Sequence, residues 1–283
     1  MIYISSSCIK NKKISKVIRQ LADNGIQSIE LSGGTNYYDE IEYDLIKLKE
    51  KYQLKYICHA YFPPPKVSFV VNLASCNDEI YKKSIEHYDN CIELLKRIDC
   101  NVLSVHAGFL LEIDKDEIGK KLSKVVIYNK DEAYSRFCYA YEKLSRKCKE
   151  QNIRLYLENN VLSRENYQEF EYQNYFMMTD YRSIMYMKEQ IDFELLLDLG
   201  HLYVSSDTLG LDYKQECSKL KKYVRWIHIS ENNGIYDEHK PLRKESMILK
   251  EFYDIVHSGI NVTLETAGSL DEILNSMKLL TDG

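Results

Sequence analysis

The side chains with the richest chemistry in this sequence are histidines and carboxylates that close short apolar runs. They end six consecutive runs, at His59, His106, Glu158, Asp198, His228 and Glu265, and His201 follows three positions after the fourth. A single histidine at such a place is more often a hydrogen-bonded core or loop residue than a ligand. A buried carboxylate is harder to dismiss, because it is costly unless a cation or a hydrogen-bond network neutralises it. The repeated pattern therefore indicates one polar site that several strands assemble.

The ligand types in this set indicate which cation the site could hold. Imidazole nitrogen and carboxylate oxygen without thiolate suit Mn²⁺, Zn²⁺, Fe²⁺ or Co²⁺, and they argue against a dedicated Ca²⁺ cage or a cysteine-type structural zinc site. A divalent metal is therefore the expected cofactor. The sequence contains no GxSxG motif, so a serine triad finds little support. His87 and His257 fall within predicted helices, and we expect them to be structural or surface groups.

The runs that carry these residues have the length and composition of β-strands. We predict strands at residues 3–6, 28–31, 55–59, 102–106, 154–158, 193–198, 224–229 and 262–265. Between them lie charged segments in which apolar residues recur at i, i+3 and i+4, which predicts helices, among them 15–24, 78–98, 131–151 and 247–257. Strands that alternate with helices require right-handed crossovers and a parallel sheet.

Eight such units are the number that closes a TIM barrel. Leu195-Leu196-Leu197 is continuously apolar, as a parallel strand covered on both faces must be. A doubly wound open sheet would show the same alternation, but its glycine-rich phosphate turn after the first strand is replaced here by Ser5-Ser6-Ser7-Cys8. No linker divides the chain. We therefore predict an α/β fold, a (β/α)8 TIM barrel that forms a single domain over residues 1–283.

Composition limits the partners and the compartment. The net charge of −5 and the pI near 5.9 give no overall attraction to phosphate backbones, so we do not expect a nucleic acid partner. The 8 cysteines form no CxxC pair and are interpreted as free thiols. No apolar stretch approaches the ~18 residues of a membrane span. We expect a cytoplasmic protein without membrane attachment, and a homo-oligomer stays open.

Several motifs, in their order along the chain, resemble the xylose isomerase-like TIM-barrel superfamily. They are Cys58-His59-Ala60-Tyr61, Asn72-Leu73-Ala74-Ser75, Val105-His106-Ala107-Gly108, Leu157-Glu158-Asn159-Asn160, Asp198-Leu199-Gly200-His201, Ile227-His228-Ile229-Ser230, Asp237-Glu238-His239-Lys240-Pro241-Leu242 and Leu264-Glu265-Thr266. The superfamily contains sugar and sugar-phosphate isomerases and epimerases, and also the endonuclease IV group of AP endonucleases. The resemblance spans essentially the whole chain.

The resemblance implies roles for individual residues. The metal site shared across the superfamily would consist of Glu158, Asp198, His228 and Glu265. The endonuclease IV pattern implies up to two further metals, one near His59 and His106 and one near His201, Asp237 and His239. One metal is the expectation, and up to three are allowed. By the same resemblance, Glu158, Glu265 and His201 would be catalytic, and the substrate would contact Tyr61, Asn159 and Arg243. A plain surface role for this arginine stays open.

Two departures bear on the activity. Arg243-Lys244-Glu245-Ser246 stands where the sugar-isomerase-like relatives commonly carry a GEG turn, and Ala107 stands where the endonuclease branch usually has proline. We expect a metal-dependent isomerase or epimerase of a small sugar or sugar phosphate, with Glu158 and Glu265 transferring a proton next to the carbonyl. The alternatives are a multinuclear zinc phosphoesterase acting at abasic DNA and a barrel that binds a sugar without turnover.

Overall fold

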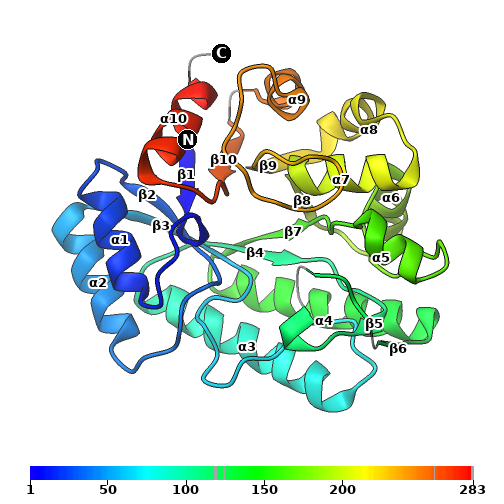
Figure 1. Cartoon of the computed structure of the whole chain (residues 1–283). Coiled ribbons are helices and arrows are strands. Elements are labelled where there is room, and N and C mark those ends of the chain that lie inside the picture. The colour runs from blue at the N-terminus through cyan, green and yellow to red at the C-terminus, as the bar shows by residue number, and fades with distance from the viewer. Residues whose placement is uncertain (118–119, 124, 258, 282–283) are drawn as a thin grey trace.

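A closed barrel of parallel strands forms the centre of the computed structural model, which describes residues 1–117, 120–123, 125–257 and 259–281 (Figure 1). Around the barrel the strands follow the order β1-β10-β9-β8-β7-β4-β3-β2. Their bounds are β1 Ile2–Ser5, β2 Ser28–Leu31, β3 Lys55–His59, β4 Val102–His106, β7 Arg154–Glu158, β8 Glu194–Asp198, β9 Val224–Ile229 and β10 Asn261–Leu264. The predicted (β/α)8 TIM-barrel fold is confirmed.

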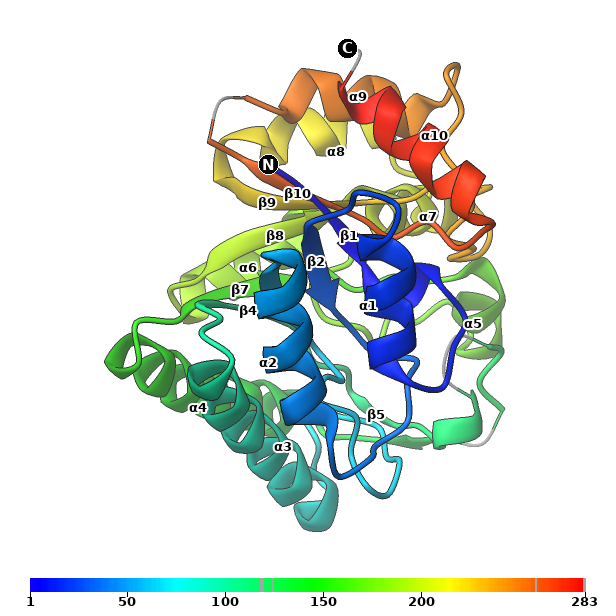
Figure 2. The same cartoon turned by 90° about the vertical axis from the view of Figure 1, so that its left-hand side faces the viewer.

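Helices lie between the strands in the chain and surround the barrel (Figures 1 and 2). They are α1 Ile14–Ala22, α2 Ile41–Tyr52, α3 Asp78–Arg97, α4 Lys130–Glu150, α5 Arg164–Glu169, α6 Tyr181–Gln190, α7 Leu199–Leu209, α8 Tyr213–Leu220, α9 Met247–Ile255 and α10 Leu270–Thr281. Side chains cap the two longest: Asn77 accepts from the backbone N–H groups of Glu79 and Ile80 before α3, and Asn129 accepts from that of Glu132 before α4. These caps satisfy donors that a helix leaves unpaired at its N-terminus.

The loop after β4 contains a feature that the sequence did not predict. Two strands of two residues, β5 Leu111–Glu112 and β6 Val126–Ile127, pair in an antiparallel sheet beside the barrel. Phe109 and Phe176 also form an isolated antiparallel bridge nearby. Segments this short carry no recognisable alternation of apolar and polar residues, which explains why they were missed.

Alternate residues of the strands face the barrel interior and build it in layers. An apolar layer consists of Tyr3, Ile57, Val102, Tyr156, Leu196 and Trp226, a buried cluster separate from the main core. The rings of Tyr3 and Tyr156 both contact Trp226, with ring centroids 5.4 and 5.3 Å apart, although β1 and β7 are not neighbours in the barrel. Two residues further along their strands stand polar side chains such as Glu158 and His228. Since residues i and i+2 share a face, a polar layer lies above the apolar one at the carboxyl ends of the strands.

The other face of the strands packs against the helices and forms the main core. Leu103, Leu157, Leu197 and Ile227 are fully buried there. Both faces of the barrel are therefore covered, as parallel sheets require. Within the described part of the chain, no helix combines the length and apolar character needed to cross a membrane.

Candidate metal centre

The polar residues at the strand ends meet in one cluster at the mouth of the barrel. Two groups of potential ligand atoms each lie within 4.8 Å of one another: Glu158, Asp198, His228 and Glu265 form one, and His59, His106 and Glu158 form the other. Glu158 joins the two groups. Its Oε1 lies 3.3 Å from His228 Nδ1, and its Oε2 lies 3.3 Å from His59 Nε2 and 3.2 Å from His106 Nδ1.

The donor set of this cluster fits a divalent cation. Both carboxylate oxygens of Glu158, Oδ2 of Asp198 and Nδ1 of His228 are buried and lack a hydrogen-bond partner within the described residues. Buried polar atoms are normally paired, because leaving them unpaired costs their full desolvation free energy. A cation held by the group of four would take one atom from each residue and so give a partner to Glu158, Asp198 and His228, and nitrogen and oxygen ligands suit Mn²⁺, Zn²⁺, Fe²⁺ or Co²⁺.

Burial and charge set the protonation states in the cluster. Burial lowers the pKa of His59 to about 3 and also lowers the pKa of His106. Burial therefore favours the neutral form of both imidazoles, which is the form that binds a metal. Burial alone would raise the pKa of Glu158, but His106, His59 and His228 hold it well below its ordinary value. Glu158 is therefore ionised and available as a ligand.

Asn159 forms hydrogen bonds with residues on both sides of the cluster. Its side-chain amide donates to the backbone oxygen of Asp198 at 3.2 Å, and its Oδ1 accepts from the backbone N–H of Asp198 at 2.7 Å. Its own backbone oxygen lies 2.9 Å from His201 Nδ1. Asn159 is fully buried and belongs to the wall between β7 and β8. Both ends of the amide are thus engaged by the backbone of Asp198, and the substrate contact of Asn159 stays a prediction.

The start of α7 positions Asp198 and His201 together. Asp198 caps this helix, and its Oδ1 accepts from the backbone N–H of His201 at 2.7 Å. Gly200 lies between them, and a Cβ added there would come within 2.4 Å of Asn232 Nδ2. Glycine therefore allows the helix to start close to the segment that follows β9.

His201, Asp237 and His239 are linked at the rim of the mouth. Oδ2 of Asp237 lies 3.2 Å from His201 Nε2 and 2.9 Å from His239 Nε2. Asn232 donates to Oδ1 of the same carboxylate at 3.2 Å. Within the described residues, these three side chains do not bring a ligand atom each within 4.8 Å of the others. The structure thus brings these three side chains together next to the cluster, and a further metal bound by them stays a prediction.

An open cavity of about 760 Å³ leads from solvent to the cluster. Seven of the predicted site residues line it together with the lysines Lys66 and Lys115, namely His59, Tyr61, His106, His201, Asp237, His239 and Glu265. A smaller cavity of about 240 Å³ adjoins it at Tyr61, His106, His201 and Asp237, and its other walls include the apolar side chains of Val70, Val71, Phe109, Ile113, Leu122 and Phe176. Together the two cavities offer space for a sugar-sized molecule.

Arg243 does not belong to the described lining of either cavity. Its guanidinium is largely exposed and lies 3.6 Å from Glu231 Oε1, in a separate pocket. The backbones of Glu231 and Lys240 pair through two hydrogen bonds of 2.9 and 2.8 Å, and the chain leaves the mouth beyond this pairing. The structure therefore places Arg243 outside the described lining of the two cavities, and its substrate contact stays a prediction. Lys66 and Lys115 line the larger cavity and Lys120 lines the smaller one, and the sequence reasoning had selected none of these lysines.

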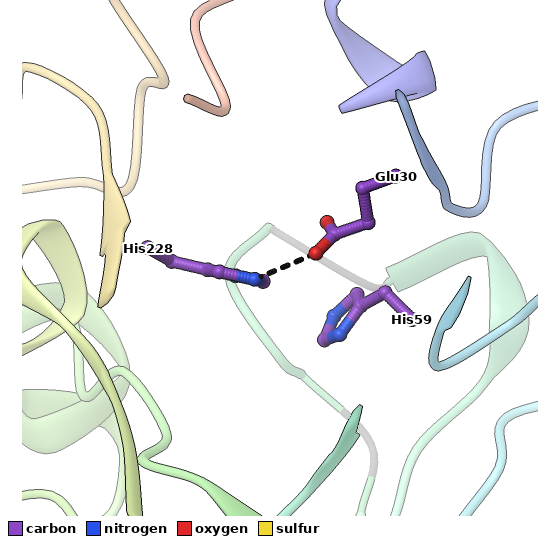
Figure 3. A group of neighbouring side chains, drawn as sticks. All are labelled: Glu30, His59 and His228. Atoms are coloured by element: carbon purple, nitrogen blue, oxygen red, sulfur yellow. Dashed lines mark hydrogen bonds and ion pairs between the residues drawn. The ribbon is translucent and has the colours of Figure 1, made fainter. Parts of the chain in front are cut away.

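Glu30 on β2 is the functional-site residue that the sequence reasoning missed. It is fully buried, and its Oε2 accepts hydrogen bonds from His228 Nε2 at 2.9 Å and from Thr263 Oγ1 at 3.0 Å. Figure 3 shows Glu30 and His228 facing each other, with His59 beside them. Burial raises the pKa of Glu30 to about 7, and His228 opposes this rise. A signal was present, because Glu30 is the single charged residue in the short strand Ser28–Leu31.

Comparisons with known proteins agree with the architecture. The family model described as xylose isomerase-like TIM barrel matches residues 18–282. A D-tagatose 3-epimerase-like protein has a TM-score of 0.73 at 17% identity, with 99% of this chain and 96% of that chain covered. For a D-psicose 3-epimerase from Clostridium cellulolyticum the TM-score is 0.64 at 13% identity, with 99% and 96% covered.

A nuclease structure and a protein without a described activity also match this chain. Endonuclease IV from Thermus thermophilus has a TM-score of 0.62 at 15% identity, with 100% of this chain and 99% of that chain covered. An uncharacterized protein of Methanocaldococcus jannaschii is 20% identical over 280 residues, with 95% of this chain and 85% of that protein covered. At these identities the likeness to solved structures shows the fold alone.

Proposed function

This chain belongs to the xylose isomerase-like TIM-barrel family, and from that premise we propose that it is a metal-dependent isomerase or epimerase of a small sugar or sugar phosphate. The observation that carries the proposal is a pair of carboxylates beside a sugar-sized cavity: Glu265 lines the cavity, and the fully buried Glu158 lies behind His59 and His106, which line it as well. Glu158 Oε1 and Glu265 Oε2 lie 3.3 and 3.4 Å from the same atom, His228 Nδ1. The epimerases among the structural neighbours support the same reaction class.

The reaction moves a proton from a carbon next to a carbonyl and returns it. When bound, the cation would supply polarisation of the carbonyl, which makes the neighbouring C–H bond acidic enough to lose its proton. Glu158 and Glu265 come from different strands of the barrel, so they approach a bound substrate from different directions. One carboxylate would take the proton and the other would return it, and return on the opposite face of the carbon gives epimerisation.

The surrounding side chains would bind and orient the substrate. His201 is held at both ring nitrogens, at 2.9 Å from the backbone oxygen of Asn159 and at 3.2 Å from Asp237, which fixes its orientation beside the cavity. Tyr61 lines both cavities and offers an aromatic face to a sugar ring. Lys66 and Lys115 line the larger cavity and would pair with the phosphate of a phosphorylated substrate.

A second candidate, a phosphoesterase with two metals, is favoured by one observation. His59, His106 and Glu158 form a ligand group that shares Glu158 with the group of four, and paired metals are a common arrangement in enzymes that hydrolyse phosphate esters. The net charge of −5 argues against a DNA substrate, because few counterions would be released on binding.

Isotope exchange separates these functions. The metal-loaded protein is incubated in deuterated water with a panel of ketoses, aldoses, inososes and their phosphates, and we expect deuterium at one carbon of the substrate or product. If the product carries no label, the experiment is repeated with substrate deuterated at that carbon. Deuterium that is retained in the product, together with a slower rate, would then identify direct transfer. Release of phosphate from the same panel would overturn the isomerase proposal in favour of hydrolysis. Binding without turnover would support the sugar-binding barrel.

A further inference from the structure

We propose that Glu30 is a positioning residue that determines which nitrogen of His228 faces the metal centre. The proposal rests on the metal centre proposed above and concerns a carboxylate outside the group of four. His228 uses both ring nitrogens: Nε2 contacts Glu30 Oε2 at 2.9 Å, and Nδ1 faces Glu158 and Glu265 at 3.3 and 3.4 Å. Glu30 and His228 are both fully buried, so solvent does not compete for these contacts (Figure 3).

The contact with Glu30 fixes the tautomer of His228. The carboxylate oxygen of Glu30 accepts the hydrogen bond, so the ring hydrogen that His228 would keep as a metal ligand sits on Nε2. Nδ1 faces Glu158 and Glu265 and is then the nitrogen whose lone pair a metal would use. The other arrangement would place a lone pair against the carboxylate of Glu30 and an N–H toward the ligand group. Glu30 therefore selects Nδ1 as the nitrogen of His228 that is available to a metal.

A hydrogen-bond chain from the apolar layer holds Glu30 in this orientation. Trp226 Nε1 donates to Thr263 Oγ1 at 3.0 Å, and Thr263 Oγ1 donates to Glu30 Oε2 at 3.0 Å. Because an indole N–H can only donate, it sets the direction of the threonine hydroxyl and turns its hydrogen toward Glu30. These hydrogen bonds link three strands, β9, β10 and β2, through buried atoms.

The competing role for Glu30 is that of a ligand. Glu30, His59 and His228 each offer an atom within 4.8 Å of the others, and Oε1 of Glu30 has no hydrogen-bond partner within the described residues. A cation held by this group would need Nε2 of His228 without its hydrogen. The two roles therefore predict different metal counts once the carboxylate is removed.

Glu30→Gln tests the positioning role, with Glu231→Gln as the matched control. Glu231 is also buried and lies two residues beyond the end of β9, but its ion pair is with Arg243. Metal content is measured by mass spectrometry, zinc affinity by chelator competition, and ligand geometry by the visible spectrum of the cobalt-loaded protein. We expect Glu30→Gln to keep the metal count, to weaken zinc binding about 10-fold to 100-fold and to change the cobalt spectrum. Glu231→Gln should match the wild type in all three.

The outcomes separate the proposals. Unchanged affinity and spectrum in Glu30→Gln would overturn the positioning role while leaving the metal centre intact. Loss of one whole metal, with the remaining metal bound as in the wild type, would make Glu30 a ligand and also overturn it. A wild-type protein that binds no zinc, cobalt or manganese would instead sink the proposed metal centre.

A measurement on the wild-type protein covers the case in which the variant fails to fold. Nitrogen-15 shifts of the zinc-loaded protein, with histidine labelled, report which ring nitrogen carries hydrogen. We expect the His228 signal to show a protonated Nε2 and a metal-bound Nδ1. The reverse assignment would overturn the role of Glu30.

Discussion

Two layers of the barrel interior are built by the same strands and differ in almost every physical respect. The apolar layer around Trp226 is a packed cluster in which the indole N–H has its partner in Thr263 Oγ1. The polar layer, two residues further along, contains buried atoms of Glu158, Asp198 and His228 that lack hydrogen-bond partners within the described residues. Packing the first layer stabilises the fold, whereas assembling the second costs free energy until something binds there. The contrast teaches that the same β-strand geometry can serve stability at one end and function at the other.

The largest expected effect comes from Glu158→Gln, which changes the carboxylate shared by both ligand groups. The variant should lose bound metal and at least about 1000-fold in kcat/KM, because it weakens a ligand and removes a proton-transfer group together. Tyr156→Phe, two residues earlier on β7 in the apolar layer, is the matched control and should keep its metal. Metal analysis and steady-state kinetics measure both. Full metal and activity in Glu158→Gln would remove this residue from the site.

Leu196→Ala should produce the opposite profile from the apolar layer. Leu196 is almost fully buried, and truncating a leucine in a core costs about 2–5 kcal/mol of unfolding free energy. The metal affinity of the folded protein should change much less than in Glu158→Gln. Urea denaturation measures the first quantity and metal titration the second. A loss of metal affinity in Leu196→Ala as large as that in Glu158→Gln would show that the two layers do not act independently.

Metal removal should connect the two layers thermodynamically. A metal at 100 times its dissociation constant stabilises the folded state by about 2.7 kcal/mol, so a chelator should lower the melting temperature and added metal should restore it. Leu196→Ala should keep this metal-dependent increment, and Glu158→Gln should lose most of it. Thermal scans with and without chelator give the comparison. If the chelator leaves the melting temperature of the wild-type protein unchanged, the metal does not contribute to the stability of the fold.

The smallest effect should come from Thr263→Val, which interrupts the hydrogen bonds that link Trp226 in the apolar layer to Glu30. The substitution leaves Trp226 Nε1 without its acceptor and removes one donor from Glu30. We expect a loss of about 1–3 kcal/mol in unfolding free energy and a few-fold weaker metal binding. Thr263→Ser retains a hydroxyl and is the control. A loss in Thr263→Ser without a loss in Thr263→Val would show that the methyl group, and not the hydroxyl, matters at this position.

The sequence predicted the strand ends well because the chemistry changes there abruptly. His59, Glu158 and His228 each follow apolar residues, and period-two alternation predicts that they face the interior with the apolar layer. The same rule explains the orientation of Asn159. It comes one position after Glu158, so its side chain turns out of the interior and bonds to the backbone of Asp198.

Other features depend on contacts that local sequence does not encode. Glu30 was missed because a lone glutamate in a short strand also fits a solvent-facing position, and its partner His228 is 198 residues away. The position of Arg243 depends on the backbone pairing of Glu231 with Lys240, and no periodic pattern of apolar residues predicts this pairing. Long-range pairing of this kind is what sequence patterns resolve least.

The hydrogen bond between Glu30 and His228 also has a consequence for how the protein is made. Synthesis proceeds from the N-terminus, so Glu30 emerges long before His228 and Glu265, and no early fragment can contain the full set of ligands. The cluster can form only when β9 and β10 complete the ring of strands beside β1. Metal uptake would therefore be a late event in the life of each new chain, and a metal-sensitive signal would report the moment at which the barrel closes.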